Sequence, residues 1–210
     1  MGIYTSKKIR QSPKLLRNDF TMTGKWNMPV IKRCDVNLEK SILIGADKIR
    51  KSESNENIFK TVHFFVDDNK LDKYFNEAEK YLPRLAQYPH VLTPDYSLYT
   101  DMPLAIQIHN TFKSRWCGAY WQEHNLSVIP TVSWSTENSY AFCFDGLEYG
   151  TAVAVSTLGS LTNKELFLKG YFKMKECINP KQVLCFGKAF PEMGAEVIVV
   201  DYLKTTGRAR

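Results

Sequence analysis

The chain has 210 residues, 44% hydrophobic and 24% charged, which is typical of one to one and a half globular domains and excludes a disordered or collagen-like protein. No apolar run approaches the roughly 20 residues of a transmembrane helix, and the first ten residues lack the apolar core of a signal peptide, so we expect a cytosolic protein with no membrane partner. The net charge of +6 is uneven: residues 1–60 hold 13 Lys and Arg against 6 Asp and Glu, and residues 61–210 hold 15 against 16.

The first 60 residues show no sustained hydrophobic period, and we expect a basic, irregular leader that packs on the rest of the chain. Two short apolar runs, 28–31 and 41–45, are interpreted as strands or as segments that pack against the main domain. The polar stretch 51–57 marks a boundary, so the predicted domains are a leader, 1–60, and an α/β domain, 61–210. The basic excess is typical of an arm that touches nucleic acid or an acidic partner, and equally of a solvated leader.

Beyond residue 60, short apolar runs alternate with helical patterns. The runs predict strands at 62–66, 90–93, 128–130, 141–144, 152–155, 183–186 and 197–200. Three helices are expected. The first spans 71–82. The second begins at a cap, Asp101, with Pro103 in its first turn, and ends at 124; the third begins at a capping box, Thr162 and Glu165, and ends at 178. This alternation predicts an α/β fold with a mainly parallel sheet of six or seven strands, either doubly wound or an incomplete (β/α) barrel.

Polar residues follow the predicted strands, at the sheet edge where ligands bind in parallel α/β folds. In chain order they are Asp67 and Asp68, Asp95 with Tyr96 and Ser97, Ser133 and Trp134, Ser156 and Thr157, Gly187 and Lys188, and Asp201. If the strands are neighbours, these side chains converge on one site. The alternative is that the aspartates serve as turn and cap residues.

Asp95 is the sharpest candidate, because Pro94 holds the chain extended and aims the side chain. It would act as a general base, a divalent-ion ligand or an anchor for a hydroxyl, or it would organise the turn 94–97. Asp67 and Asp68 would complete a divalent-cation site with Asp95, since Mg²⁺ is held by one or two carboxylates and phosphate oxygens. Asp68 or Asn69 would alternatively cap the next helix.

One face of the helix expected before residue 124 carries polar side chains in helical register. Asn110, Lys113 and Ser114 share this face, and His109 flanks it. With Arg115 they would contact phosphate or orient a substrate; the alternative is a solvated face.

Familiar catalytic and metal-binding motifs are absent from the sequence. It contains no phosphate loop, dinucleotide fingerprint, HExxH pair or GxSxG elbow, and its four histidines lack metal-ligand spacing. The five cysteines, at 34, 117, 143, 177 and 185, form no CxxC pair, which favours reduced thiols over disulfides or zinc. Cys143 and Cys185 are interpreted as buried strand residues.

The central stretch from 91 to 160 resembles a family of bacterial and phage proteins, the domain-of-unknown-function family 4417. The matching segments are 94–97, 110–115, 118–121, 128–134, 144–146 and 154–157. The resemblance implies a phage, prophage or mobile-element setting, in the cytoplasm of a bacterial host, and it carries no activity. It also implies that Asp95, Asn110, Arg115, Trp134, Asp145 and Ser156 belong to the pattern that defines the group.

Two functions are compatible with these features. In the first, an enzyme-like pocket at the strand ends binds or transforms a nucleotide or nucleic-acid phosphate compound, with Asp95, Asp67 and Ser156 as catalytic residues. Its ligand would be held by Asn110, Arg115, Trp134 and Asp145, with Arg115 on the phosphate and a divalent cation as a cofactor at Asp67, Asp68 and Asp95. In the second, the protein is no enzyme: the basic leader binds nucleic acid, or the protein binds and inhibits a host protein.

Overall fold

Seven parallel strands in two sheets form the centre of the structure, a computed structural model that describes residues 20–200. The first sheet has the order β3 (Leu43–Gly45), β4 (Thr61–His63), β5 (His90–Leu92) and β6 (Val128–Ile129). The second has the order β7 (Val153–Ser156), β8 (Val183–Phe186) and β9 (Ile198–Val200). The predicted mixed α/β class with parallel pairing is therefore confirmed.

The prediction of a single sheet of six or seven strands was wrong, because the parallel strands form two sheets. Neither a doubly wound sheet nor an incomplete barrel therefore describes the chain. The two sheets are linked by one isolated bridge, Thr131 to Ala154, with hydrogen bonds from Val132 N to Ala154 O (2.8 Å) and from Ala154 N to Pro130 O (2.9 Å). β6 is two residues long, and Pro130, which follows it, has no N–H to donate to a neighbouring strand. The ladder is therefore interrupted where a continuous sheet would need it.

The prediction of a strand at 141–144 was also wrong. Ala141 ends the 3₁₀ helix η2 (Glu137–Ala141), and residues 142–144 form a turn in which Phe142 and Cys143 are buried. Its place among the seven strands is taken by β3, from one of the two apolar runs of the leader. The first 19 residues of the leader lie outside the described residues. The division of the chain at residue 60 stays a prediction.

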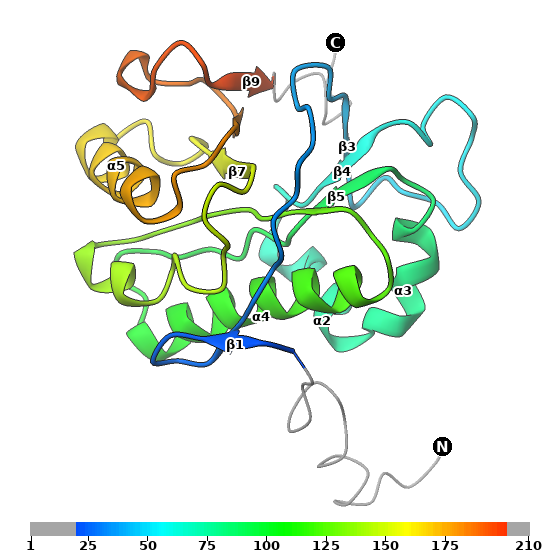
Figure 1. Cartoon of the computed structure of the whole chain (residues 1–210), viewed down its shortest axis with the longest axis horizontal. Helices are drawn as coiled ribbons and strands as arrows, with labels where there is room; N and C mark the ends of the chain where they lie inside the picture. Colours follow the sequence, from blue (N-terminus) through cyan, green and yellow to red (C-terminus); the bar gives the residue numbers. More distant parts are fainter. Residues whose placement is uncertain (1–19, 201–210) are drawn as a thin grey trace, which may run out of the picture.

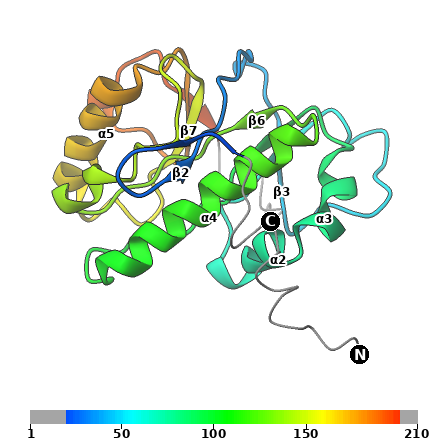
Figure 2. The same cartoon turned by 60° about the horizontal axis from the view of Figure 1, so that its bottom comes forward.

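Helices pack beside the sheets, and short 3₁₀ helices lie in the connections that follow β4, β6 and β8 (Figures 1 and 2). The predicted helix 71–82 is divided into α2 (Asp72–Asn76) and α3 (Ala78–Leu85), and the second runs through Pro83. The other two predicted helices are α4 (Leu104–Glu123), which lies below β3, β4, β5 and β7 in Figure 1, and α5 (Lys164–Ile178). The remaining elements are β1 (Met22–Thr23), β2 (Met28–Pro29), η1 (Asp68–Lys70) and η3 (Pro191–Met193).

The expected helix caps are not formed by the predicted residues. Pro103 precedes the first residue of α4, and Asn163 precedes that of α5, neither with a capping side-chain hydrogen bond. Asp68 lies within η1 and makes its bonds elsewhere. Across residues 20–200, no helix combines the length and the apolarity that a membrane crossing requires.

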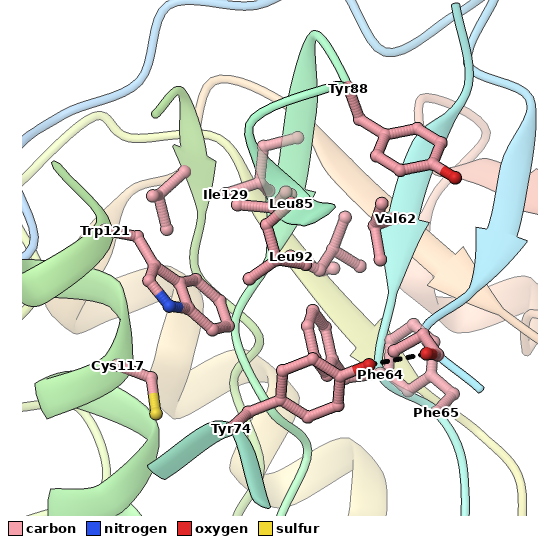
Figure 3. Packing of buried hydrophobic residues seen from close by; sticks show 14 of the residues in the cluster. Val62, Phe64, Phe65, Tyr74, Leu85, Tyr88, Leu92, Cys117, Trp121 and Ile129 are labelled. Carbon is pink, nitrogen blue, oxygen red and sulfur yellow. Dashed lines mark hydrogen bonds between the residues drawn. The ribbon is translucent and has the colours of Figure 1, made fainter. Parts of the chain in front are cut away.

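The main core lies between the first sheet and helices α2, α3 and α4 (Figure 3). Phe64 stacks on Trp121 of α4 at 5.3 Å between ring centres and meets Tyr74 of α2 edge-on at 4.8 Å. The Tyr74 hydroxyl donates to the carbonyl of Ala46 at 2.5 Å, which ties α2 to the segment after β3. All five cysteines are free, and Cys177 alone among them is exposed.

Gly118 allows α4 to lie close to the chain beneath it, and alanine at this position is expected to destabilise the fold. An added Cβ would lie 2.5 Å from Ile31 Cδ1 and 2.8 Å from Thr93 Cγ2. We expect Gly118→Ala to lower the free energy of unfolding by about 1–3 kcal/mol. This net loss remains after the stabilisation that alanine's higher helix propensity contributes. Urea denaturation measures the loss, and Ile31→Val, which removes Cδ1, should restore part of it in the double variant. A Gly118→Ala protein as stable as the wild type would contradict this packing.

Candidate functional site

A cavity of about 540 Å³ lies where β5, β6 and β7 end, within the usual size range of small-molecule sites. Because these strands are parallel and adjacent, the segments that follow them open at the same edge. The segments 95–101, 132–135 and 156–163 line it, together with the start of α5. Its side chains are Asp95, Ser97, Leu98, Tyr99, Thr100, Asp101, Val132, Ser133, Trp134, Ser135, Ser156, Leu158, Ser160, Thr162, Asn163, Leu166 and Phe167.

Asp95 and Asp101 are the two carboxylates that line this cavity, and the chain around Asp95 is fixed by hydrogen bonds. Thr93 Oγ1 accepts the N–H of Thr131 at 2.9 Å, and the Thr93 carbonyl accepts the Thr131 hydroxyl at 2.8 Å. The Ser133 hydroxyl donates to Asp95 Oδ1. Asp95 and Ser133, 38 residues apart, are therefore held side by side by two neighbouring strands.

Burial raises the pKa of Asp95 to about 6; the Ser133 hydrogen bond opposes this shift and the nearby Asp68 carboxylate adds to it. A carboxyl group with this pKa can accept or release a proton close to neutral pH, which suits acid–base chemistry. The geometry thus provides a titratable group inside a ligand-sized cavity.

Asp68 and Asn110 hold the segment that leads from Asp95 to the rim of the cavity. Asp68 accepts the N–H of Ser97 at 3.2 Å and its hydroxyl at 3.0 Å, and Asn110 Nδ2 donates to the Ser97 carbonyl at 2.9 Å. Neither residue lines the cavity. They position Ser97, which does.

Trp134 and Ser156, both predicted as site residues, line the cavity. The Trp134 ring packs against Phe167 of α5 at 5.1 Å between ring centres, and Gly170, one turn further along α5, faces the ring. The Ser156 hydroxyl accepts the N–H of Leu158 at 3.2 Å and shapes the loop that closes this side.

Alanine at Gly170 is expected to displace Trp134, because an added Cβ would overlap ring atoms Cδ1 and Nε1. We expect Gly170→Ala to lower the free energy of unfolding by about 1–3 kcal/mol and to change the near-ultraviolet circular dichroism of the tryptophans. Lys169→Ala, an exposed neighbour on the same helix, is the control and should leave the spectrum unchanged. An unaltered spectrum in Gly170→Ala would show that the ring does not need this space.

Arg115 and Asp145, predicted as ligand-binding residues, lie outside the lining of the large cavity. Arg115 is 2% exposed, and its guanidinium donates to the backbone carbonyls of Asp145 (Nε, 2.9 Å), Thr131 (3.2 Å) and Cys143 (2.6 Å). Burial lowers the pKa of Arg115 to about 10, so the group stays charged at neutral pH. These contacts tie α4 to two loops. Each guanidinium nitrogen already donates to a backbone carbonyl, so none is reserved for a phosphate.

The predicted metal site is not assembled by the described residues. Asp67 is 77% exposed and forms an ion pair with Lys70 at 3.2 Å, away from the cavity. Within residues 20–200 no group of three or more His, Cys, Asp or Glu side chains is placed to hold a metal ion. The divalent-cation ligand set of Asp67, Asp68 and Asp95 therefore has no geometric support.

The sequence did not point to several of the residues that line the cavity. Ser135 follows Ser133 and Trp134 after β6, so the strand-end rule reaches it. Asp101 and Thr162 were interpreted as helix caps, and their residue types carried no other signal. The loop 157–163 contributes because it connects β7 to α5, two elements that the sequence predicted.

Comparisons with known proteins found a matching family and relatives in phages. The family described as "Domain of unknown function (DUF4417)" matches residues 20–203. The "Gene 1 protein" of Mycobacterium phage L5 is 42% identical over 130 residues, which is 60% of this chain and 57% of the relative. The "Gene 1 protein" of Mycobacterium phage D29 is 39% identical over 130 residues, 60% of this chain and 48% of the relative. The chain thus spans about half the length of these curated relatives, and no solved structure matches it.

Proposed function

The chain belongs to the family of the domain of unknown function DUF4417, which has relatives in phages, and from this premise we propose that it acts through the cavity at the ends of β5, β6 and β7. The cavity binds a small organic ligand, with Asp95 as the residue that contacts the ligand and exchanges a proton with it. A phage or mobile-element setting in the cytoplasm of a bacterial host is part of the proposal.

The observation that carries the proposal is the placement of Asp95. Its carboxylate shares a cavity of about 540 Å³ with hydroxyl groups from three strand ends, Ser97, Ser133 and Ser156. Ser133 orients the carboxylate, and Ser156 and Ser97 offer hydrogen bonds to polar groups of a ligand. Trp134 and Phe167 supply an apolar wall against which a ring or hydrocarbon face would pack.

The charges of the cavity favour an uncharged or positively charged ligand over a phosphate. Among the lining residues, all of which are described, there is no Lys, Arg or His. Arg115, the guanidinium expected to bind phosphate, is occupied by three carbonyls. A nucleotide would therefore place its base and sugar in this cavity more readily than its phosphates.

A thermal-shift screen at pH 7.5 tests the proposal with nucleosides, sugars, amines and nucleotides as separate compound classes. A ligand at 100 times its Kd should stabilise the fold by about 2.7 kcal/mol. We expect the stabilisation to be lost in Asp95→Asn and kept in Asp67→Asn, the exposed carboxylate after the neighbouring strand. Full ligand stabilisation in Asp95→Asn would contradict the role of this cavity.

A second function rests on charge: residues 1–60 carry a net +7, as nucleic-acid-binding or acidic-partner-binding arms do. In this alternative the α/β body is a scaffold, and the leader binds nucleic acid or a host protein. Removing residues 1–19, which precede β1, should then abolish a binding that weakens steeply with salt, whereas Asp95→Asn should leave it intact. Salt-independent binding that survives the truncation would exclude residues 1–19 as the binding segment.

A further inference from the structure

We infer that the cavity takes an organic cation, an amine or a guanidinium group, which pairs with the Asp95 carboxylate and lies against the ring of Trp134. This inference rests on the proposed function of the cavity and names the ligand class.

The first step is the missing counter-ion of Asp95. Within residues 20–200 its one hydrogen-bond donor is the neutral hydroxyl of Ser133, and no Lys, Arg or His nitrogen lies within ion-pair distance. Carboxylates withdrawn from water are normally paired with a cation or protonated. A cationic ligand in the cavity would supply the partner that the chain itself does not.

The second step is that the nearby protein cations are already engaged elsewhere. Lys113 of α4 forms an ion pair with Asp72 at 3.0 Å, and its ammonium lies 3.8 Å from the centre of the Tyr96 ring. Arg115 is held by three backbone carbonyls. Asp68 and Asp101 add negative charge, the first close enough to act on Asp95 and the second on the cavity wall.

The third step is the composition of the remaining walls. Trp134, Tyr99 and Phe167 offer aromatic faces, which attract cations, most strongly so for tryptophan. Ser97, Ser133 and Ser156 add hydroxyl groups to the same lining. A hydroxyl oxygen can accept an N–H of a bound ammonium or guanidinium group.

An organic cation fits this site better than a metal ion. The described residues contain no group of three or more His, Cys, Asp or Glu side chains placed as metal ligands, and hard cations require several such oxygen donors. One carboxylate, several hydroxyls and aromatic walls instead match a group that needs a single ion pair, a few hydrogen bonds and an apolar contact.

Calorimetry with matched probes tests the inference on the full chain at pH 7.5. The probes are 2-phenylethylamine and agmatine as cations, 2-phenylethanol as the neutral counterpart of the first, and phenyl phosphate as the anion. We expect a cationic probe to bind the wild type at least tenfold more tightly than the alcohol and the phosphate. The advantage should disappear in Asp95→Asn and remain in Asp67→Asn.

The outcomes separate this inference from the proposed function. Equal or tighter binding of the alcohol or of phenyl phosphate to the wild type overturns the inference that the ligand is a cation. The proposal that the cavity is a binding site still stands if that binding depends on Asp95. Binding of every probe that is unchanged in Asp95→Asn overturns both. Absence of binding by both cations at 20 mM also overturns the inference. Thermal melting of each variant shows that it is folded before binding is measured.

Discussion

Replacing Asp95 by asparagine is expected to stabilise the protein at pH 7.5 by about 2–3 kcal/mol while it removes ligand binding. Burial raises the pKa of Asp95 to about 6, against about 4 for an aspartate in an unfolded chain. The native state must therefore hold a carboxylate that would be better solvated in the unfolded chain. Asparagine has the same shape, stays neutral and still accepts the hydrogen bond from Ser133.

The pH dependence gives this prediction its sign. Below pH 4 the carboxyl group is protonated in both states of the wild type, so the two proteins should be equally stable. Between pH 4 and 6 the native wild type binds more protons than the unfolded chain, so its stability falls as the pH rises, and the advantage of Asp95→Asn grows. Above pH 6 to 7 the advantage reaches its plateau.

Urea denaturation of both proteins at pH 4, 5, 6 and 7.5 measures this difference, and groups shared by the two proteins cancel. Asp67→Asn serves as the control, because its side chain is 77% exposed and should show no such pH-dependent gain. A less stable Asp95→Asn at pH 7.5, or a gain of the same size at pH 4, would show that the carboxylate is not held at an energetic disadvantage. An ionisable group whose pKa is shifted by burial inside a cavity is typical of a functional site.

The edge of the sheet that carries the cavity was predictable from the sequence, because each apolar run ends in polar residues and parallel strands end at one edge. This rule brought together Asp95, Trp134 and Ser156, which are up to 61 residues apart and share the cavity. It failed for Asp67, because the chain turns into η1 directly after this residue and leaves its side chain in solvent. Asp68, its neighbour, points instead to Ser97.

Contacts between loops were beyond the reach of sequence patterns. The segment 141–144 is as apolar as a strand, but its Cys143 carbonyl accepts from Arg115 of α4 and its Phe142 carbonyl accepts from the N–H of Asp145 within the turn. In the same way, an arginine on a helix that also carries Asn110 and Lys113 suggests a polar surface, whereas the fold turns Arg115 inward. Both errors come from one long-range interaction that leaves no local signal.

That interaction makes Arg115 the position where substitution should cost the most stability. Arg115→Ala would leave the carbonyls of Thr131, Cys143 and Asp145 without the donor that they share, and each buried, unpaired polar group costs about 1–3 kcal/mol. Relief of the buried positive charge offsets part of this loss. We expect a net loss of about 3–5 kcal/mol, a large share of the 5–15 kcal/mol that stabilises a typical domain. Urea denaturation at pH 7.5 measures it.

The matched variants decide whether Arg115 acts by holding the fold or by contacting a ligand. Arg115→Lys keeps the charge, but a single ammonium does not span three carbonyls, so it should recover no more than about half of the loss. Arg50→Ala, an exposed arginine, should change stability by less than about 0.5 kcal/mol. If Arg115→Lys were as stable as the wild type and lost ligand binding instead, the guanidinium would belong to the binding site. The three carbonyl contacts predict the opposite: a destabilised Arg115→Lys protein whose remaining folded fraction binds the ligand of Asp95 with unchanged affinity.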